Sequence, residues 1–223
     1  MIQTFGASNV SSRESDELFS RIATDIENKG YSINMEALPL HLGETLSQHL
    51  HGLSGEKFNP AGIGRDVQHV RNDSVRSDEI CWITGESESG RDWLQWTTHL
   101  QDYLNRRLFL GLFSFESHFS HYAEGDFYKR HVDAFKGEAN RVLSLVVYLN
   151  SDWKQSDGGE FLLYENEGDS EGTKVSPSFG TMVVFLSEDF PHEVFATHRD
   201  RYSIAGWFRI NTSTAEPVQP PND

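Results

Sequence analysis

The sequence predicts a mainly β domain of the sandwich or barrel kind, with helices packed against it. Residues 113–211 are mostly short alternating or β-branched runs, and turn sequences such as SDGG at 156–159 and PSFG at 177–180 separate them. Many short strands at this spacing are typical of sandwiches and barrels. A chain of 223 residues with 37% hydrophobic residues is long enough for one full core, with or without a helical annex.

The part of the chain before residue 113 has longer segments with apolar residues at helical spacing, such as Leu18, Ile22 and Ile26. An aromatic stripe that runs from Trp93 to Tyr103 is best explained by helix packing. The elements predicted here are helices at 12–28, 39–53 and 92–110, strands at 31–34 and 79–84, a Gly/Pro-containing connection at 56–70 and a polar loop at 85–90.

The strands predicted for the second part alternate apolar and polar residues or carry β-branched runs. They lie at 113–123, 128–132, 142–149, 160–164, 173–175, 181–186, 192–195 and 202–210. We therefore expect residues 1–112 to give helical support, early strands and a mobile loop within one domain, residues 113–211 to form the catalytic β core, and residues 212–223 to be a flexible tail.

Composition excludes several classes of protein. A net charge of −15 disfavours the phosphate backbone of nucleic acids and anionic membrane surfaces, so we expect neither as a partner. Cys81 is the only cysteine, which fits a reducing compartment. The first residues show no signal peptide, and no stretch approaches the ~20 apolar residues of a membrane span. We expect a cytoplasmic protein.

His131, Asp133 and His192 form the strongest candidate site. Residues two apart on a strand share a face, so His131 and Asp133 can point at one ion, and His192 from a distant strand would complete the set. Two histidines and one carboxylate cover one face of Fe(II) and leave the other open for oxygen and a co-substrate. An isolated His-x-Asp pair is usually a surface or turn feature. Here the presence of His192 and the strand context favour a metal site instead.

Arg201 lies nine residues after His192, where the next strand can begin. A fixed guanidinium there can grip a carboxylate in a fork, which together with iron implies an oxygenase with a dicarboxylic co-substrate. Tyr148 ends an apolar run, so its hydroxyl can reach that carboxylate, with plain core packing as the alternative. Tyr122 lies on a polar strand face that can look into a pocket.

Other polar clusters carry simpler explanations. His49 and His51 are two apart on a predicted helix and do not face each other. His118 and His121 are three apart on a predicted strand, so they point to opposite faces. The acidic run at 165–171 is expected to be a solvated loop.

At these residues the chain resembles the prolyl hydroxylases of the Fe(II)/2-oxoglutarate oxygenases, in particular the bacterial relatives of the animal hypoxia-inducible-factor prolyl hydroxylases. The resemblance covers about residues 74–211 and is strongest between 122 and 208. Its motifs are YKRHVD at 128–133, VYLNSDW at 147–153, GG at 158–159, FPHEV at 190–194, RYSIAGWF at 201–208 and, earlier, VRSDEICWITG at 75–85.

The resemblance implies a double-stranded β-helix, a cupin-like jelly roll, and an enzyme that hydroxylates a prolyl residue of a protein while 2-oxoglutarate and oxygen become succinate and carbon dioxide. Bacterial members modify elongation factor Tu, which is the expected partner, and ascorbate is an expected accessory. The implied roles are iron ligation by His131, Asp133 and His192, co-substrate binding by Arg201, Tyr148 and Tyr122, and substrate contacts by Arg76, Tyr128, Arg141 and Trp207.

Two departures from the animal enzymes stand out. Ala205 occupies a position where they carry a hydroxyl-bearing residue, and a short proline-rich tail replaces their longer C-terminal region.

Three other functions compete with this one. A nucleic-acid demethylase with the same iron chemistry would need a basic groove, which the acidic balance disfavours. A hydroxylase of free amino acids or other small molecules, and a catalytically silent barrel that binds a ligand as a sensor, remain alternatives. Residues 76–93, with Gly85 and Gly90 as hinges, are a candidate lid over a polypeptide substrate, and an ordinary surface loop is the alternative.

Overall fold

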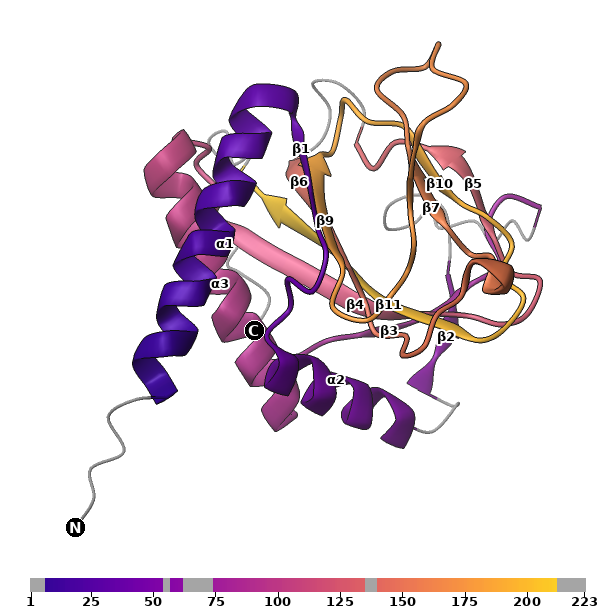
Figure 1. The fold of residues 1–223 in the computed structure, drawn as a ribbon, viewed down its shortest axis with the longest axis horizontal. Coiled ribbons are helices and arrows are strands. Elements are labelled where there is room, and N and C mark those ends of the chain that lie inside the picture. The colour runs from indigo at the N-terminus through magenta and orange to yellow at the C-terminus, as the bar shows by residue number, and fades with distance from the viewer. Residues whose placement is uncertain (1–6, 54–56, 62–73, 135–139, 212–223) are drawn as a thin grey trace.

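A computed structural model describes residues 7–53, 57–61, 74–134 and 140–211, with side chains from residue 14 onward. Two antiparallel sheets face each other, and three helices cover the outer side of the larger one (Figure 1). The larger sheet has the strand order β1-β9-β6-β11-β4-β3-β2, and the smaller has the order β5-β10-β7-β8. In chain order the elements are α1 Ala7–Lys29, β1 Tyr31–Asn34, α2 Leu40–Gly52, β2 Asn59–Pro60, β3 Glu79–Trp82, α3 Glu88–Leu108, β4 Ser114–Tyr122, β5 Tyr128–His131, β6 Arg141–Tyr148, η3 Gln155–Asp157, β7 Phe161–Leu163, β8 Thr173–Val175, β9 Met182–Leu186, β10 His192–Val194 and β11 Arg201–Arg209.

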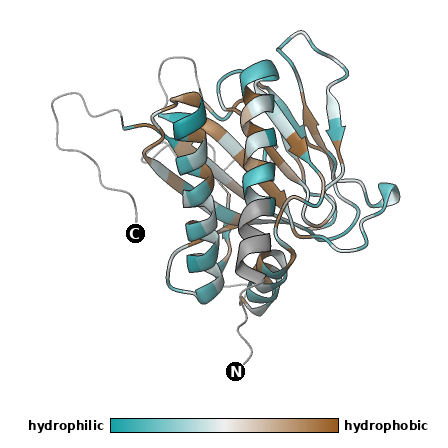
Figure 2. Cartoon of the chain, turned by 60° about the vertical axis from the view of Figure 1, so that its left-hand side comes forward, coloured by the Kyte–Doolittle hydropathy of each residue, from teal (hydrophilic) through white to brown (hydrophobic). Residues whose placement is uncertain are grey.

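The helices and the larger sheet enclose the main hydrophobic core. Alternate residues of β6, namely Leu143, Leu145 and Val147, are fully buried toward the helices. Trp93 and Leu100 of α3 are also fully buried, which confirms that the aromatic stripe of this helix serves packing. In Figure 2 the outward surfaces of the two long helices are mostly hydrophilic, whereas the strands behind them carry many hydrophobic residues.

The opposite face of the larger sheet packs against the smaller sheet in a second core. Tyr148, Phe185 and Tyr122 come from the larger sheet, and Phe161 and Val194 come from the smaller one. Because side chains alternate along a strand, the residues of β6 that do not face the helices (Ser144, Val146 and Tyr148) face the space between the sheets. The candidate site lies in this space.

The predicted elements are confirmed, with bounds that shift by a few residues. The predicted loop at 85–90 is shorter than expected, because Ser87 caps α3 by accepting a hydrogen bond from the backbone N–H of Gly90 at 3.0 Å, and the helix begins at Glu88. A Cβ atom on Gly90 would lie 2.2 Å from the carbonyl oxygen of Thr84, so this glycine permits a close approach. Gly90 is therefore a packed residue in the first turn of α3 and not a loop residue, and the hinge assigned there from the sequence stays a prediction.

Two sequence predictions lie partly or wholly beyond these residues. The connection at 56–70 is described only at its start, where β2 adds a short edge strand that the sequence did not predict. The tail at 212–223 lies outside the described residues. Among the helices that the structure describes, none has the length and hydropathy needed to cross a membrane.

Candidate active site

Three metal-ligand side chains converge between the sheets. His131 ends β5 and His192 begins β10, and they are direct partners across this strand pair. The Nε2 atom of His131 lies 3.7 Å from Oδ1 of Asp133, and Nε2 of His192 lies 3.7 Å from Oδ2. The three donor atoms all lie within 4.8 Å of one another, as required for ligands of one ion. Asp133 lies just beyond the end of β5, whereas the shared-face prediction treated it as part of the strand that carries His131.

Backbone carbonyl groups fix the orientation of both imidazole rings. Nδ1 of His131 lies 2.8 Å from the carbonyl oxygen of Lys129, and Nδ1 of His192 lies 3.0 Å from that of Phe190. A carbonyl can only accept, so each Nδ1 carries the proton and donates it, which leaves the Nε2 lone pair for a metal. Burial, together with the neighbouring His192, lowers the pKa of His131 to about 3, so this ring is neutral and able to ligate at physiological pH.

Asp133 is held by a hydroxyl group that sequence reasoning missed. The Ser144 hydroxyl donates to Oδ2 of Asp133 at 2.6 Å, and the Ser187 hydroxyl lies 2.9 Å from that of Ser144. Burial alone would raise the pKa of Asp133, but the two histidines and the Ser144 hydroxyl outweigh it and hold this pKa at about 2. Asp133 is therefore an anionic ligand.

Arg201 is a buried cation that lacks a carboxylate partner among the described residues. It is 1% exposed, and it donates hydrogen bonds to the Gly159 carbonyl oxygen through Nε at 2.9 Å and to the Ser203 hydroxyl through Nη1 at 3.3 Å. Its guanidinium carbon lies 4.9 Å from the ring centroid of Tyr122 and 5.0 Å from that of Tyr148. A buried unpaired charge is costly, so this environment suits an anionic ligand.

The Tyr148 hydroxyl is a second polar group without a described partner in the neighbourhood of Arg201. The structure buries its ring completely, and no described residue hydrogen-bonds to its hydroxyl. Burial raises its pKa, so the hydroxyl keeps its proton and can donate. The guanidinium and this hydroxyl together make a donor set that fits the far carboxylate of 2-oxoglutarate.

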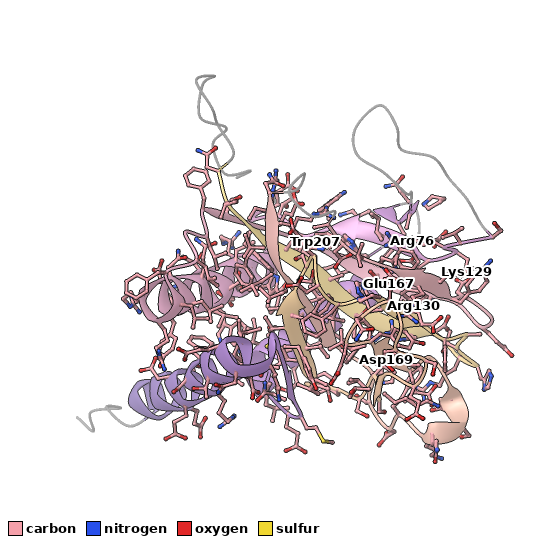
Figure 3. The ribbon with its side chains drawn as sticks, turned by 90° about the horizontal axis from the view of Figure 1, so that it is seen from above. Arg76, Lys129, Arg130, Glu167, Asp169 and Trp207 are labelled. Carbon is pink, nitrogen blue, oxygen red and sulfur yellow. The ribbon has the colours of Figure 1, made fainter. Side chains whose placement is uncertain are left out.

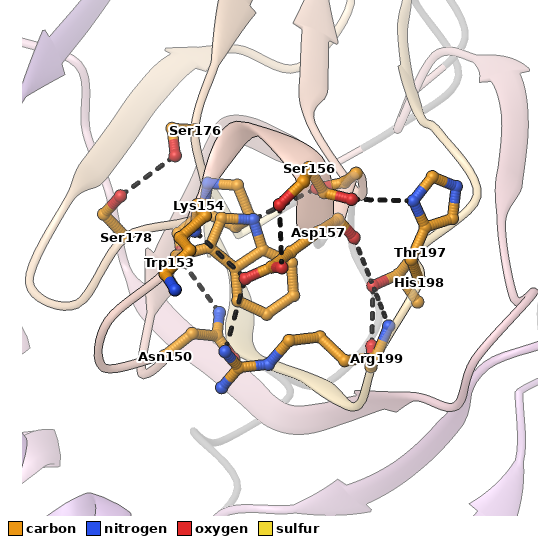
Figure 4. Close-up of polar contacts among 12 residues, drawn as sticks. Asn150, Trp153, Lys154, Ser156, Asp157, Ser176, Ser178, Thr197, His198 and Arg199 are labelled. Atoms are coloured by element: carbon orange, nitrogen blue, oxygen red, sulfur yellow. Dashed lines mark hydrogen bonds and ion pairs between the residues drawn. The ribbon is translucent and has the colours of Figure 1, made fainter.

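The loop between β6 and β7 places the carbonyl that orients Arg201. Figure 4 shows how Asp157 and Ser156 tie this loop to the segment before β11: His198 Nδ1 lies 2.9 Å from the Ser156 carbonyl oxygen, and Arg199 Nη1 lies 3.3 Å from Asp157 Oδ2. Gly159 has a φ of +65°, and an added Cβ would lie 3.0 Å from Cδ of Arg201. A glycine is therefore needed both for the backbone and for the arginine.

Tyr128 and Arg76 border the metal ligands on one side. The Tyr128 ring stacks on the His131 imidazole with centroids 3.6 Å apart, and the Arg76 guanidinium lies 4.6 Å from the Tyr128 centroid. Arg76 forms a two-pronged ion pair with the fully shielded Asp78 carboxylate, at 2.5 and 2.9 Å. Arg76 thus already has an internal partner, which the sequence did not reveal.

Trp207 and Arg141 lie on the other side. The Arg141 guanidinium is 3.7 Å from the centroid of the Trp207 ring, and Trp207 is 8% exposed. Trp207 is paired across the strands with Ser144, so its indole lies beside the residue that holds Asp133. The structure therefore gathers all the residues predicted for the site around one space, and their roles toward a substrate remain predictions.

The structure also describes His118, His121 and the acidic run at 165–171, for which the sequence predicted no part in the site. His118 is buried, and its imidazole lies between Trp82 and Trp207, at 5.3 and 5.5 Å between centroids, while His121 pairs with Asp200 on the opposite face of the sheet. The acidic run at 165–171 is largely exposed, as predicted, and Arg130 anchors it by donating to the carbonyl oxygens of Asn166 and Asp169 at 2.7 and 2.8 Å (Figure 3).

Comparison with known proteins identifies the domain. Residues 117–209 match the family model described as the 2OG-Fe(II) oxygenase superfamily. A solved prolyl-4-hydroxylase of Pseudomonas putida is 36% identical to this chain and superposes with a TM-score of 0.77, covering 86% of this chain and 99% of that one. A prolyl hydroxylase of Trichoplax adhaerens, solved with a hypoxia-inducible-factor peptide fragment, gives a TM-score of 0.76 over 92% of this chain and 94% of that one at 24% identity, which supports the fold alone.

The curated relatives are longer proteins. Human Egl nine homolog 1 is 30% identical over 142 residues, which are 60% of this chain and 33% of that protein. The chain thus spans about a third of the length of this relative. These similarities confirm the predicted jelly-roll fold and the predicted kinship, and the donor set described above fits the iron and 2-oxoglutarate that the superfamily name specifies.

Proposed function

Because this chain belongs to the 2OG-Fe(II) oxygenase superfamily, we propose that it hydroxylates a prolyl residue of a protein with Fe(II), oxygen and 2-oxoglutarate. One observation carries the proposal: a complete His131, Asp133 and His192 set lies in the same intersheet space as the buried, carboxylate-free guanidinium of Arg201. A silent barrel would have no need for both features, because each costs free energy to bury without its ligand.

The residues divide the work of binding. His131, Asp133 and His192 would hold the iron through two nitrogens and one carboxylate oxygen, and Arg201 with the Tyr148 hydroxyl would hold the far carboxylate of 2-oxoglutarate. When bound, the iron supplies the oxidising chemistry, in which one oxygen atom enters a prolyl C–H bond and the other enters succinate as carbon dioxide leaves. Tyr122 would shield the co-substrate.

The substrate contacts follow from the groups around the iron ligands. The aromatic rings of Tyr128, stacked on His131, and of Trp207, beside Ser144, lie next to the ligand set, and such rings suit contact with the apolar ring of a prolyl residue. The Arg141 guanidinium lies over the Trp207 ring and is partly exposed, so it can donate to a peptide carbonyl group. Arg76 would act through Tyr128, on which its guanidinium lies.

We propose elongation factor Tu as the protein substrate, on the strength of the resemblance to bacterial prolyl hydroxylases that modify it. The Pseudomonas putida enzyme, of bacterial origin, supports the comparison by its 36% identity. The candidate lid at 76–93 has less irregular structure than the sequence predicted. Because Glu79–Trp82 is a strand and α3 starts at Glu88, only residues 83–87 of its second half lie outside regular structure. Closure of this segment is a prediction.

Mass spectrometry tests the proposal directly. The purified protein is incubated with elongation factor Tu, Fe(II), ascorbate and 2-oxoglutarate, and we expect one added oxygen on one proline, matched by succinate. His131→Ala provides the inactive control, since it removes a ligand. Oxygen on free proline but not on the protein would favour the small-molecule alternative, and 2-oxoglutarate binding without succinate from either would favour the sensor.

A further inference from the structure

Glu116, a residue of β4 that the proposed mechanism does not use, joins two arginines at the edge of the site. Its Oε1 accepts from Nη2 of Arg141 at 3.1 Å, and its Oε2 accepts from Nη1 of Arg209 at 2.9 Å. Arg141 is the residue whose guanidinium lies 3.7 Å from the centroid of Trp207. The side chains of Glu116, Arg141 and Arg209 are 17%, 22% and 24% exposed, so water only partly screens these pairs.

The strand register explains why a carboxylate is needed here. Arg141 of β6 and Arg209 of β11 are direct partners, and Glu116 of β4 is the direct partner of Trp207 in β11. Like charges directly opposite each other across a strand pair repel. Glu116 is the only described carboxylate that pairs with either arginine, so one anion holds two cations in place.

The two bonds restrict a side chain that would otherwise be mobile. An arginine side chain loses rotamer entropy when it is fixed. If Arg141 were free to move, a substrate would have to order it upon binding, and affinity would fall accordingly. With the guanidinium already fixed over Trp207, that ordering precedes binding.

We infer that Glu116 is a positioning residue, which holds Arg141 over Trp207 and thereby prepares the peptide-contacting edge of the site. This inference rests on the proposed function, because Arg141 and Trp207 are there assigned to the substrate. Glu116 acts through Arg141 and does not touch the iron ligands.

The test compares Glu116→Gln with Glu27→Gln. Glutamine preserves the size of Glu116 but removes the charge that both arginines need. Glu27 of α1 also pairs with an arginine, Arg107 of α3, at 3.1 Å, but this pair joins two helices and lies outside the space between the sheets, so its variant is the matched control. With elongation factor Tu as the varied substrate, we expect KM to rise about tenfold in Glu116→Gln only, which corresponds to about 1.4 kcal/mol. Glu116→Asp, which keeps the charge, should recover part of the loss.

Readouts at the iron and co-substrate separate positioning from general damage. The Mn(II) affinity and the 2-oxoglutarate affinity should match those of Glu27→Gln, and circular dichroism should show a folded protein, although repulsion between Arg141 and Arg209 should lower the midpoint of thermal unfolding. An equal KM in both variants, or a KM rise that a fall in 2-oxoglutarate affinity accompanies, overturns the inference.

A crystal structure of Glu116→Gln provides a readout that needs no substrate. We expect the Arg141 guanidinium to leave the Trp207 ring, and a guanidinium still stacked there overturns the inference. If wild-type protein fails to hydroxylate elongation factor Tu, the proposed substrate fails, while this structure still decides the role of Glu116.

Discussion

Ser144 offers the sharpest test of how the iron ligands are held. Its hydroxyl donates to Asp133 at 2.6 Å, a distance typical of a hydrogen bond to a charged oxygen, and it is buried at 1% exposure. Such a bond contributes about 1.5–3 kcal/mol. At about 1.4 kcal/mol per tenfold change, Ser144→Ala should weaken metal binding by about 10- to 100-fold.

Isothermal titration calorimetry with Mn(II) in place of Fe(II) measures this affinity without turnover. Ser120→Ala is the matched control, because Ser120 is also buried in the same sheet, on β4, but its hydroxyl lies 3.1 Å from Nδ1 of His118 and is not hydrogen-bonded to Asp133. Wild-type affinity in Ser144→Ala, or an equal loss in both variants, would refute the reasoning. Circular dichroism verifies that both variants fold.

Three further predictions concern the co-substrate, a glycine and a buried histidine. Arg201→Lys should raise the Kd for 2-oxoglutarate at least about tenfold in calorimetry of the Mn(II)-loaded protein, because a point charge cannot reproduce the fork, and an unchanged Kd would contradict the assignment. Gly159→Ala should lose about 1–2 kcal/mol of stability in urea unfolding and also weaken 2-oxoglutarate binding, whereas Gly125→Ala, with a φ of +92° but no atom within 4 Å of the added Cβ, should lose stability alone. Burial lowers the pKa of His118 to about 3 from its ordinary 6.5, so the unfolded chain binds a proton at this residue more readily than the folded chain does. The stability that the neutral His118 contributes is therefore complete above pH 6.5. It should fall by about 1.4 kcal/mol per pH unit as the pH drops toward 3. His118→Asn should flatten this dependence between pH 7 and 5, and equal slopes would contradict it.

The sequence predicted most of the fold because alternation and turns are local signals. The strand at Thr173–Val175 and the strand at Tyr31–Asn34 were placed at their observed bounds. The start of α3 was missed, since GESESG looks like a loop until Ser87 is recognised as an N-cap with Gly90 packed against Thr84. That packing is a tertiary contact, which no local pattern reports.

The candidate site divides in the same way. The metal-ligand set could be predicted because His131, Asp133 and His192 are chemically distinctive and strand context limits where they point. The supporting residues could not, since Ser144 and Glu116 act through partners many residues away. One feature of the sequence could have indicated Ser144: it is a hydroxyl residue in an otherwise apolar strand, on the same face as Tyr148.

A crystal structure with Mn(II) and 2-oxoglutarate, grown without oxygen, tests the central assignment most directly. We predict one metal ion about 2.0–2.3 Å from Nε2 of His131, a carboxylate oxygen of Asp133 and Nε2 of His192, with the far carboxylate of 2-oxoglutarate paired to Arg201 and the Tyr148 hydroxyl. A metal ion bound elsewhere, or a co-substrate whose carboxylate lies away from Arg201, would contradict the assignment.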